Sequence, residues 1–128
     1  NPIIMGGAGT IDVVSDTLTW TGTISGAGGI LTKEGAGTLK LSSASGNTYS
    51  AGTDLNDGIV EVTTDGQFGT GTVTFNTGEL AASNTLSYSN ILDLMSDGTI
   101  DVLTGGSLTW TGTVTNTGKL IKNHFCII

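Results

Sequence analysis

The chain has 128 residues, of which 37% are hydrophobic, with 21 glycines and one proline, and this composition excludes both intrinsic disorder and a collagen-like chain. Four lysines and no arginine stand against eleven acidic residues, and the net charge of −7 excludes a nucleic-acid partner, which would require clustered basic residues. No apolar run approaches the roughly 18 residues of a spanning helix, and the sequence starts at Asn1 without a signal peptide. We therefore expect a mature or internal segment of a longer protein.

Short runs of alternating apolar and polar residues follow one another along the whole chain. Each run is bounded by glycine, asparagine or aspartate, and threonine and valine are frequent within them. Alternation with a period of two places the apolar side chains on one face of a strand. The pattern predicts an all-β chain of ten or more short strands, among them residues 17–21, 38–41, 59–62, 72–75 and 99–102.

An internal duplication relates residues 9–31 to residues 98–121. Gly9-Thr-Ile-Asp-Val returns at Gly98, and Leu18-Thr-Trp-Thr-Gly-Thr returns at Leu108. The offset of about 90 residues is longer than a single solenoid turn of about 20–50 residues. A block of turns can be copied in a solenoid because each turn contacts only its neighbours. The duplication favours a parallel β-solenoid, a fragment of a longer stack, over an antiparallel sandwich of hairpins.

Residues 28–41 read Gly-Gly-Ile-Leu-Thr-Lys-Glu-Gly-Ala-Gly-Thr-Leu-Lys-Leu, and they are followed by Gly-Asn-Thr-Tyr-Ser-Ala-Gly-Thr at residues 46–53 and by a glycine-led strand at residues 58–62. With these motifs, the stretch from Gly28 to Val62 resembles the autotransporter-associated β-strand repeat of Gram-negative passenger domains. Ile30 and Ala51 depart from the pattern of that repeat. The resemblance implies a right-handed parallel β-helix that is secreted and exposed at the bacterial cell surface, associated with the outer membrane through a C-terminal β-barrel translocator in the full-length protein. The residues that carry it are Gly28, Gly29, Leu31, Thr32, Lys33, Gly35, Gly37, Thr38, Leu39, Leu41, Asn47, Thr48, Tyr49, Gly52 and Thr53.

We interpret residues 1–123 as one β-helical passenger segment. The second copy of the duplication departs from the repeat after Asn123, and residues 124–128 are predicted to be an aberrant or truncated tail. This tail contains His124 and Cys126, and a single thiol cannot form an internal disulfide. In an isolated segment, the unpaired strand edges at both ends predict self-association.

Asp54, Asn56 and Asp57 form the densest group of side-chain oxygens and are the candidate cation ligands. The alternative, which the Asp-Gly turn favours, is capping of that turn by side-chain oxygens. The calcium-binding nonapeptide of β-rolls is absent from the sequence. We expect neither a metal nor a cofactor.

Paired carboxylates must be weighed because parallel β-helices also host carbohydrate-active enzymes. The candidate pairs are Asp12 with Asp16 and Asp97 with Asp101, but Asp12 and Asp101 are equivalent in the duplication, which indicates a structural role. His124 is the one histidine, and no catalytic triad can be built around it. The sequence predicts a structural or adhesive segment that contacts host or neighbouring-cell components or glycans. The alternative is a carbohydrate-active enzyme or carbohydrate-binding module.

Trp20 and Trp110 alternate with Leu18 and Leu108 in equivalent strands, which predicts that both indoles pack in the core rather than stack on sugars. Threonines at every second position, in residues 17–23 and 109–117, could instead form an ice-binding array. Such an array needs threonines in successive turns, and these runs lie far apart in sequence. We interpret them as solvent-facing strand residues.

Overall fold

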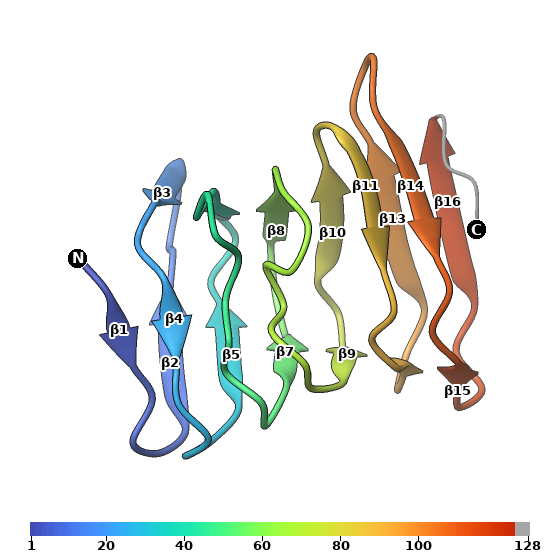
Figure 1. Ribbon diagram of the computed structural model, residues 1–128. Coiled ribbons are helices and arrows are strands. Elements are labelled where there is room, and N and C mark those ends of the chain that lie inside the picture. Colours follow the sequence, from blue (N-terminus) through green and yellow to red (C-terminus); the bar gives the residue numbers. More distant parts are fainter. Residues whose placement is uncertain (125–128) are drawn as a thin grey trace.

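The computed structural model describes residues 1–124, and the predictions that concern residues 125–128, including Cys126, lie outside this range. The described chain contains sixteen strands and no helix, and it winds as a coil from the N-terminal to the C-terminal end (Figure 1). No helix among residues 1–124 is long and apolar enough to cross a bilayer.

Two six-stranded parallel sheets form two sides of the coil, and the chain passes through one strand of each in every turn. Sheet I consists of β2 (Gly9–Asp12), β5 (Leu31–Glu34), β7 (Thr53–Leu55), β9 (Val73–Phe75), β12 (Leu92–Leu94) and β15 (Val114–Thr115). Sheet II consists of β3 (Thr17–Trp20), β6 (Thr38–Leu41), β8 (Ile59–Val62), β10 (Glu79–Ala82), β13 (Gly98–Val102) and β16 (Leu120–His124). The predicted parallel β-solenoid is confirmed, and the described residues form six turns of it.

The third side of the coil is only partly β-strand. β1 (Ile3–Ile4) pairs with β4 (Ile24–Ser25) at one end, and β11 (Thr85–Tyr88) pairs with β14 (Ser107–Trp110) at the other. Between these pairs, backbone hydrogen bonds from Thr48 N to Ile24 O (2.8 Å) and from Thr70 N to Tyr49 O (3.1 Å) connect the turns. This side therefore relies on loops in the middle of the stack.

Successive turns place equivalent apolar side chains directly above one another in the core. Leu39, Val60, Leu80 and Ile100 are register partners in sheet II, 20 or 21 residues apart, and each is at most 1% exposed. Each such side chain contributes about 1.5–3 kcal/mol on burial, whereas ordering one residue costs about 1–2 kcal/mol. One turn cannot offset its own ordering, so the stability is a cooperative property of the stack.

The two copies of the duplication adopt the same local structure on different sides of the coil. The pair β1 and β4 is equivalent to the pair β12 and β15, but the first lies on the third side and the second in sheet I. Likewise β2 belongs to sheet I and its copy β13 to sheet II. From β2, four turns along sheet I lead to β12, and β13 is the next strand. The duplicated block is thus four turns and one further side.

Both tryptophans face the core, but only one is fully covered. Trp110 is 5% exposed, which confirms its predicted burial, and its Nε1 donates to Asn90 O at 2.8 Å. Trp20 is half-buried and Leu18 is 41% exposed, although Leu18 is the register partner of the buried Leu39. β3 is the first strand of sheet II and has a neighbour on one side only, so an inward position there does not ensure burial.

The ordered strands extend one residue further than the predicted boundary at residue 123. His124 is the last residue of β16 and the register partner of Val102. Its Nδ1 lies 2.5 Å from Asp101 Oδ1 in the preceding turn. His124 is therefore part of strand β16.

A methyl group at Gly112 is expected to disrupt the contact between the last two turns. An added Cβ at Gly112 would lie 1.8 Å from Asn90 O, whereas one at Gly7 would meet no atom within 4 Å. Gly112→Ala should lower the free energy of unfolding by about 3 kcal/mol, because backbone must move. Urea unfolding followed by circular dichroism measures this loss. Gly7→Ala is the matched control, and equal stability of the two variants would contradict the tight packing at Gly112.

Candidate functional site

The lysine of the repeat motif points into the coil. Lys33 is 1% exposed, and its Nζ donates to Glu34 O (2.6 Å), Gly35 O (2.6 Å) and Asp57 O (3.1 Å). Three carbonyl acceptors match the three N–H donors of an ammonium group. Burial lowers the pKa of Lys33, while the nearby Asp57 carboxylate acts in the opposite direction. Lys33 thus ties its own turn to the next one, where Asp57 lies.

Asn47 replaces the missing strand pairing on the third side of the coil. Its Oδ1 accepts a hydrogen bond from Ile24 N at 2.8 Å, and its Nδ2 donates to Gln67 O at 2.7 Å. Ile24 and Gln67 lie in the turns before and after Asn47, and Asn47 itself is 7% exposed. One amide side chain therefore links three consecutive turns.

Tyr49 and Thr53 of the motif extend this buried polar network. The Tyr49 hydroxyl and Thr53 Oγ1 lie 2.5 Å apart, and burial raises the pKa of the fully buried Tyr49 well above its usual range. Gln67, also fully buried, donates from Nε2 to Ser43 O at 2.7 Å. Gln67 and Ser43 were missed by the motif because they lie outside the matched positions, and an isolated glutamine gives no sequence signal of burial.

The other motif residues shape the core and the turns. Leu31, Leu39 and Leu41 are core residues, whereas Thr32 and Thr38 alternate with them on the outer side. Gly35 has a φ of +78°, and a Cβ there would lie 2.4 Å from Val13 O in the preceding turn, so the position requires glycine. The motif is a structural joint between turns.

Two of the three candidate cation ligands, Asn56 and Asp57, have separate hydrogen-bond partners. Asn56 Nδ2 donates to Glu34 Oε1 (2.7 Å) and its Oδ1 accepts from Asn76 Nδ2 (2.6 Å), so Asn56 belongs to a ladder that runs across turns. Asp57 Oδ1 accepts from Gly58 N at 2.8 Å, and Asp54 lies on the outer side of sheet I. Among residues 1–124, no group of three or more histidine, cysteine, aspartate or glutamate side chains could hold a metal ion.

Three of the four candidate catalytic carboxylates, Asp16, Asp97 and Asp101, contact other groups. Asp97 Oδ1 accepts from Lys119 N at 2.9 Å, Asp101 contacts His124, and Asp16 Oδ2 accepts from Ser15 Oγ at 3.2 Å. Asp12 is on β2 at the edge of sheet I, in register with Glu34. In both predicted pairs, the hydrogen bonds shown by the structure go to groups other than the second carboxylate.

The Glu79 carboxyl group, on the outer side of sheet II, has a raised pKa. Desolvation raises it above 4.5 and the Asp101 carboxylate adds to the effect. Because the folded state holds this proton more tightly, stability falls as the pH rises through the window above 4.5. Glu79→Gln should therefore raise the melting temperature at neutral pH, with a gain that shrinks as the pH is lowered through the window above 4.5 and is lost below it. Differential scanning calorimetry measures the melting temperatures at each pH. A gain in melting temperature that does not depend on pH would contradict the electrostatic cause.

The outer side of sheet I carries one continuous polar column. Its six members are consecutive register partners, and Thr115 Oγ1 donates to Asp93 Oδ1 at 3.2 Å. The predicted threonine runs do not contribute a shared array, because β3 lies in sheet II and β14 on the third side. The column consists of Thr10, Thr32, Asp54, Thr74, Asp93 and Thr115.

Aromatic rings are inside the coil rather than on its surface. Phe68 and Tyr88 have ring centroids 5.3 Å apart, and Tyr88 stacks on Trp110 at 5.4 Å. Tyr49 and Phe75 are fully buried. Within residues 1–124 every aromatic side chain is buried or half-buried, so none offers an exposed platform for a sugar ring.

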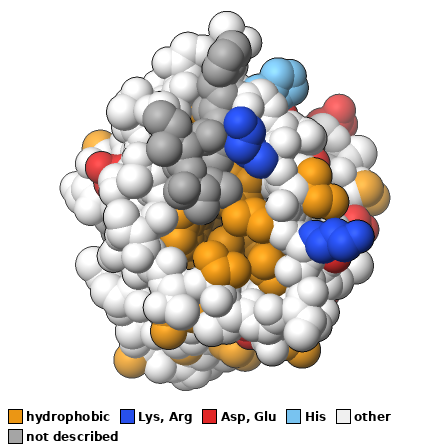
Figure 2. All heavy atoms as spheres, turned by 90° about the vertical axis from the view of Figure 1, so that its right-hand side faces the viewer, with side chains coloured by type: hydrophobic (Ala, Val, Ile, Leu, Met, Phe, Trp, Pro, Cys, Tyr) orange, Lys and Arg blue, Asp and Glu red, His pale blue; other side chains and the backbone are white. Residues whose placement is uncertain are grey.

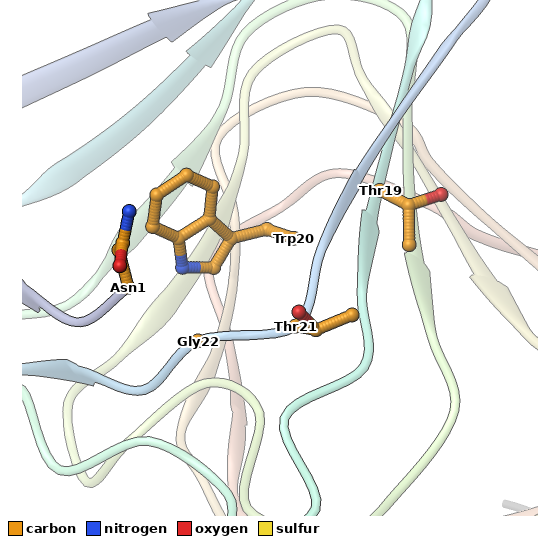
Figure 3. Close-up of a pocket in the computed structure, with 5 residues that line it drawn as sticks. All are labelled: Asn1, Thr19, Trp20, Thr21 and Gly22. Atoms are coloured by element: carbon orange, nitrogen blue, oxygen red, sulfur yellow. The ribbon is translucent and has the colours of Figure 1, made fainter.

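A small cavity of about 170 Å³ lies at the first turn, where the Trp20 indole faces Asn1 (Figure 3). An added Cβ at Gly22 would lie 2.0 Å from Asn1 O, and one at Gly112 would lie 1.8 Å from Asn90 O. Asn1 therefore takes the place beside Gly22 that Asn90 takes beside Gly112. The cavity is part of a structural contact, and its lining residues are Asn1, Thr19, Trp20, Thr21 and Gly22.

Comparison with known proteins agrees with this architecture. The family model of the passenger-associated-transport-repeat matches residues 31–62, which run from β5 to the end of β8. The chain is 29% identical over 136 residues to the adhesin BmaC autotransporter of Brucella suis biovar 1 (strain 1330), covering 94% of this chain and 4% of the relative. The chain thus spans a small part of the length of that relative, and no solved structure matches it. Residues 31–62 are an autotransporter passenger repeat, carried on a parallel β-solenoid.

Proposed function

We propose that the chain is an adhesive scaffold segment of a surface-exposed autotransporter passenger. The segment is exported to the bacterial cell surface and remains associated with the outer membrane through a C-terminal β-barrel translocator of the longer protein. The observation that carries this proposal is the passenger repeat at residues 31–62, whose Lys33 and Asn47 join consecutive turns of the coil. A joint of this kind serves a long stack of turns.

The outer surface suits polar contacts with host or neighbouring-cell components or glycans. The polar column of sheet I offers hydroxyl and carboxylate groups at a regular spacing. The net charge of −7 makes the sides of neighbouring solenoids repel one another. The relationship to a protein named an adhesin supports a non-enzymatic role. The separate partners of Asp97, Asp101 and Asp16 disfavour the carbohydrate-active enzyme, and the inward aromatic rings disfavour a carbohydrate-binding module.

Bead-binding assays test the adhesive role. Beads coated with the chain should bind epithelial monolayers or bacterial layers more strongly than albumin-coated beads. Replacing Thr32, Thr74 and Thr115 by alanine should reduce this binding, since it removes hydroxyls from the polar column. The matched control replaces Thr17, Thr38 and Thr99 on the outer side of sheet II. Binding no greater than that of albumin-coated beads would contradict adhesion.

We expect the isolated chain to associate through its ends. Apolar side chains gather at the end of the coil formed by β14, β15 and β16 (Figure 2), where Val114 is 45% and Ile121 is 42% exposed. Exposed parallel strand edges template further pairing. Light scattering coupled to size-exclusion chromatography should show a mass that rises with concentration. A monomer at every concentration would contradict stacking of the ends.

A further inference from the structure

The chain contains three Asp-Gly steps, at Asp57, Asp65 and Asp97, and all three aspartates are exposed. An Asp-Gly peptide is chemically labile because glycine has no side chain to shield its nitrogen. That nitrogen can attack the aspartate Cγ and form a five-membered succinimide. Because all three aspartates are exposed, exposure does not indicate which step reacts fastest. The hydrogen bonds of each aspartate and of the glycine nitrogen that follows it do.

Two of the three aspartates are held by the following turn of the coil. Asp65 Oδ1 accepts from Ser87 N at 2.7 Å, and Asp97 Oδ1 accepts from Lys119 N at 2.9 Å. In addition, Gly98 N, the nitrogen that would attack Asp97, donates to Lys119 O at 2.8 Å. This nitrogen is therefore already engaged in a hydrogen bond to the following turn. Ring closure at either step requires these contacts between turns to break.

Asp57 differs from both. Its Oδ1 accepts from Gly58 N at 2.8 Å, so its carboxyl group already lies against the nitrogen that would attack it. The buried Lys33 lies on the other side of the same peptide, with Nζ 3.1 Å from Asp57 O. That carbonyl becomes one of the two imide carbonyls of the succinimide, and the cation is therefore placed on a reacting oxygen.

We propose that Asp57-Gly58 is a site of spontaneous isomerisation to isoaspartate, and that Lys33 acts on its main-chain carbonyl. Gly58 N attacks Cγ of the protonated Asp57 carboxyl group; the N–Cγ bond forms, a Cγ–O bond breaks, and the nitrogen proton leaves with that oxygen as water. A second water then adds to one imide carbonyl. Addition at the main-chain carbonyl breaks its C–N bond and gives isoaspartate, whereas addition at Cγ restores aspartate.

Lys33 favours the first of these two openings. When water adds to the main-chain carbonyl, negative charge develops on the oxygen that Lys33 Nζ contacts, and a positioned cation stabilises that charge. In the product the former carbonyl is a free carboxylate, which pairs with the buried ammonium group. The isoaspartate also lengthens the backbone by one carbon where Gly58 is tightly packed, since a Cβ there would lie 2.4 Å from Gly35 O.

The rate at each step is measured by ageing the chain at neutral pH and body temperature. Peptide mapping with electron-transfer fragmentation distinguishes isoaspartate from aspartate at each position. Isoaspartate at Asp57 should form about tenfold faster than at Asp65 or Asp97, because its reacting groups are already in contact. In concentrated urea the three rates should converge. Equal rates in the folded chain, or an unchanged advantage of Asp57 in urea, would overturn the assignment of this site.

The role of Lys33 is tested by the ratio in which the succinimide opens to isoaspartate and to aspartate. In ¹⁸O-labelled water every ring opening inserts one ¹⁸O, so aspartate formed through the succinimide is distinguished from aspartate that never reacted. The ratio of isoaspartate to labelled aspartate at Asp57 should be higher in the folded wild type than in urea, a comparison that needs no variant. Lys33→Met should return the folded ratio to the urea value, whereas Lys40→Met should leave it unchanged. An equal ratio in the folded and urea-unfolded wild type would overturn the role of Lys33.

Discussion

Replacing Lys33 by methionine is expected to lower the free energy of unfolding by about 2–4 kcal/mol. Methionine keeps most of the apolar volume of the side chain, so the loss does not come from a cavity. It comes from the oxygens of Glu34, Gly35 and Asp57, which all lose the donor that Lys33 Nζ provides. Two of these carbonyls belong to one turn and the third to the next, so the joint between the turns weakens as well.

Lys40 provides the matched control. Its Nζ pairs with Glu61 Oε1 at 2.8 Å on the outer side of sheet II, and its side chain is 34% exposed. An ion pair in such a position contributes about 0–1 kcal/mol, so Lys40→Met should cost less than about 1 kcal/mol. Urea unfolding of both variants measures the difference. Equal losses for Lys33→Met and Lys40→Met would contradict a structural role of the inward lysine.

The pH dependence of the Lys33 variant provides a second comparison. Burial lowers the pKa of Lys33 below 10.5, so in the window below 10.5 the unfolded chain binds more protons than the folded chain. The contribution of this group therefore becomes more favourable as the pH rises through that window. The stability difference between wild type and Lys33→Met should grow with alkaline pH, and the difference for Lys40→Met is the baseline for this comparison.

Replacing Asn47 by alanine is expected to lower the free energy of unfolding by about 2–3 kcal/mol. The change removes the acceptor of Ile24 N and the donor to Gln67 O, and both bonds are buried. No strand pairing on the third side compensates for them, because loops form this side in the middle of the stack. Urea unfolding should show one cooperative transition at a lower midpoint.

Two further asparagine variants make this prediction specific. Asn84 is exposed and its Nδ2 donates to Thr63 O at 2.7 Å, so Asn84→Ala should cost less than about 1 kcal/mol. Asn47→Asp keeps the acceptor for Ile24 N but places a carboxylate oxygen against Gln67 O. It should destabilise at least as much as Asn47→Ala. A tolerated Asn47→Asp would show that the bond to Gln67 contributes nothing.

Several features of the fold could be predicted because they are local. Apolar and polar residues alternate in β6 and β13, and this alternation identifies the strands and the side of each that faces the core. The same parity places Lys33 on the side of Leu31, so its inward direction could have been recognised from the sequence. The repeat motif also selected Asn47, Tyr49 and Thr53, which are all buried.

The internal duplication and its two tryptophan strands show which features of the fold can be predicted from the sequence and which cannot. The sequence by itself determined that the chain is a stack of parallel turns, because strand period and block repetition are properties of neighbouring residues. Only the tertiary structure decided that the two copies lie on different sides of the coil, that Trp110 is covered while Trp20 is half-buried, and that Gln67 completes the network of Asn47. The physical reason is the length of a turn: the partners of each residue lie about 20 positions away, and the register between turns is set by packing of the whole stack rather than by any local pattern.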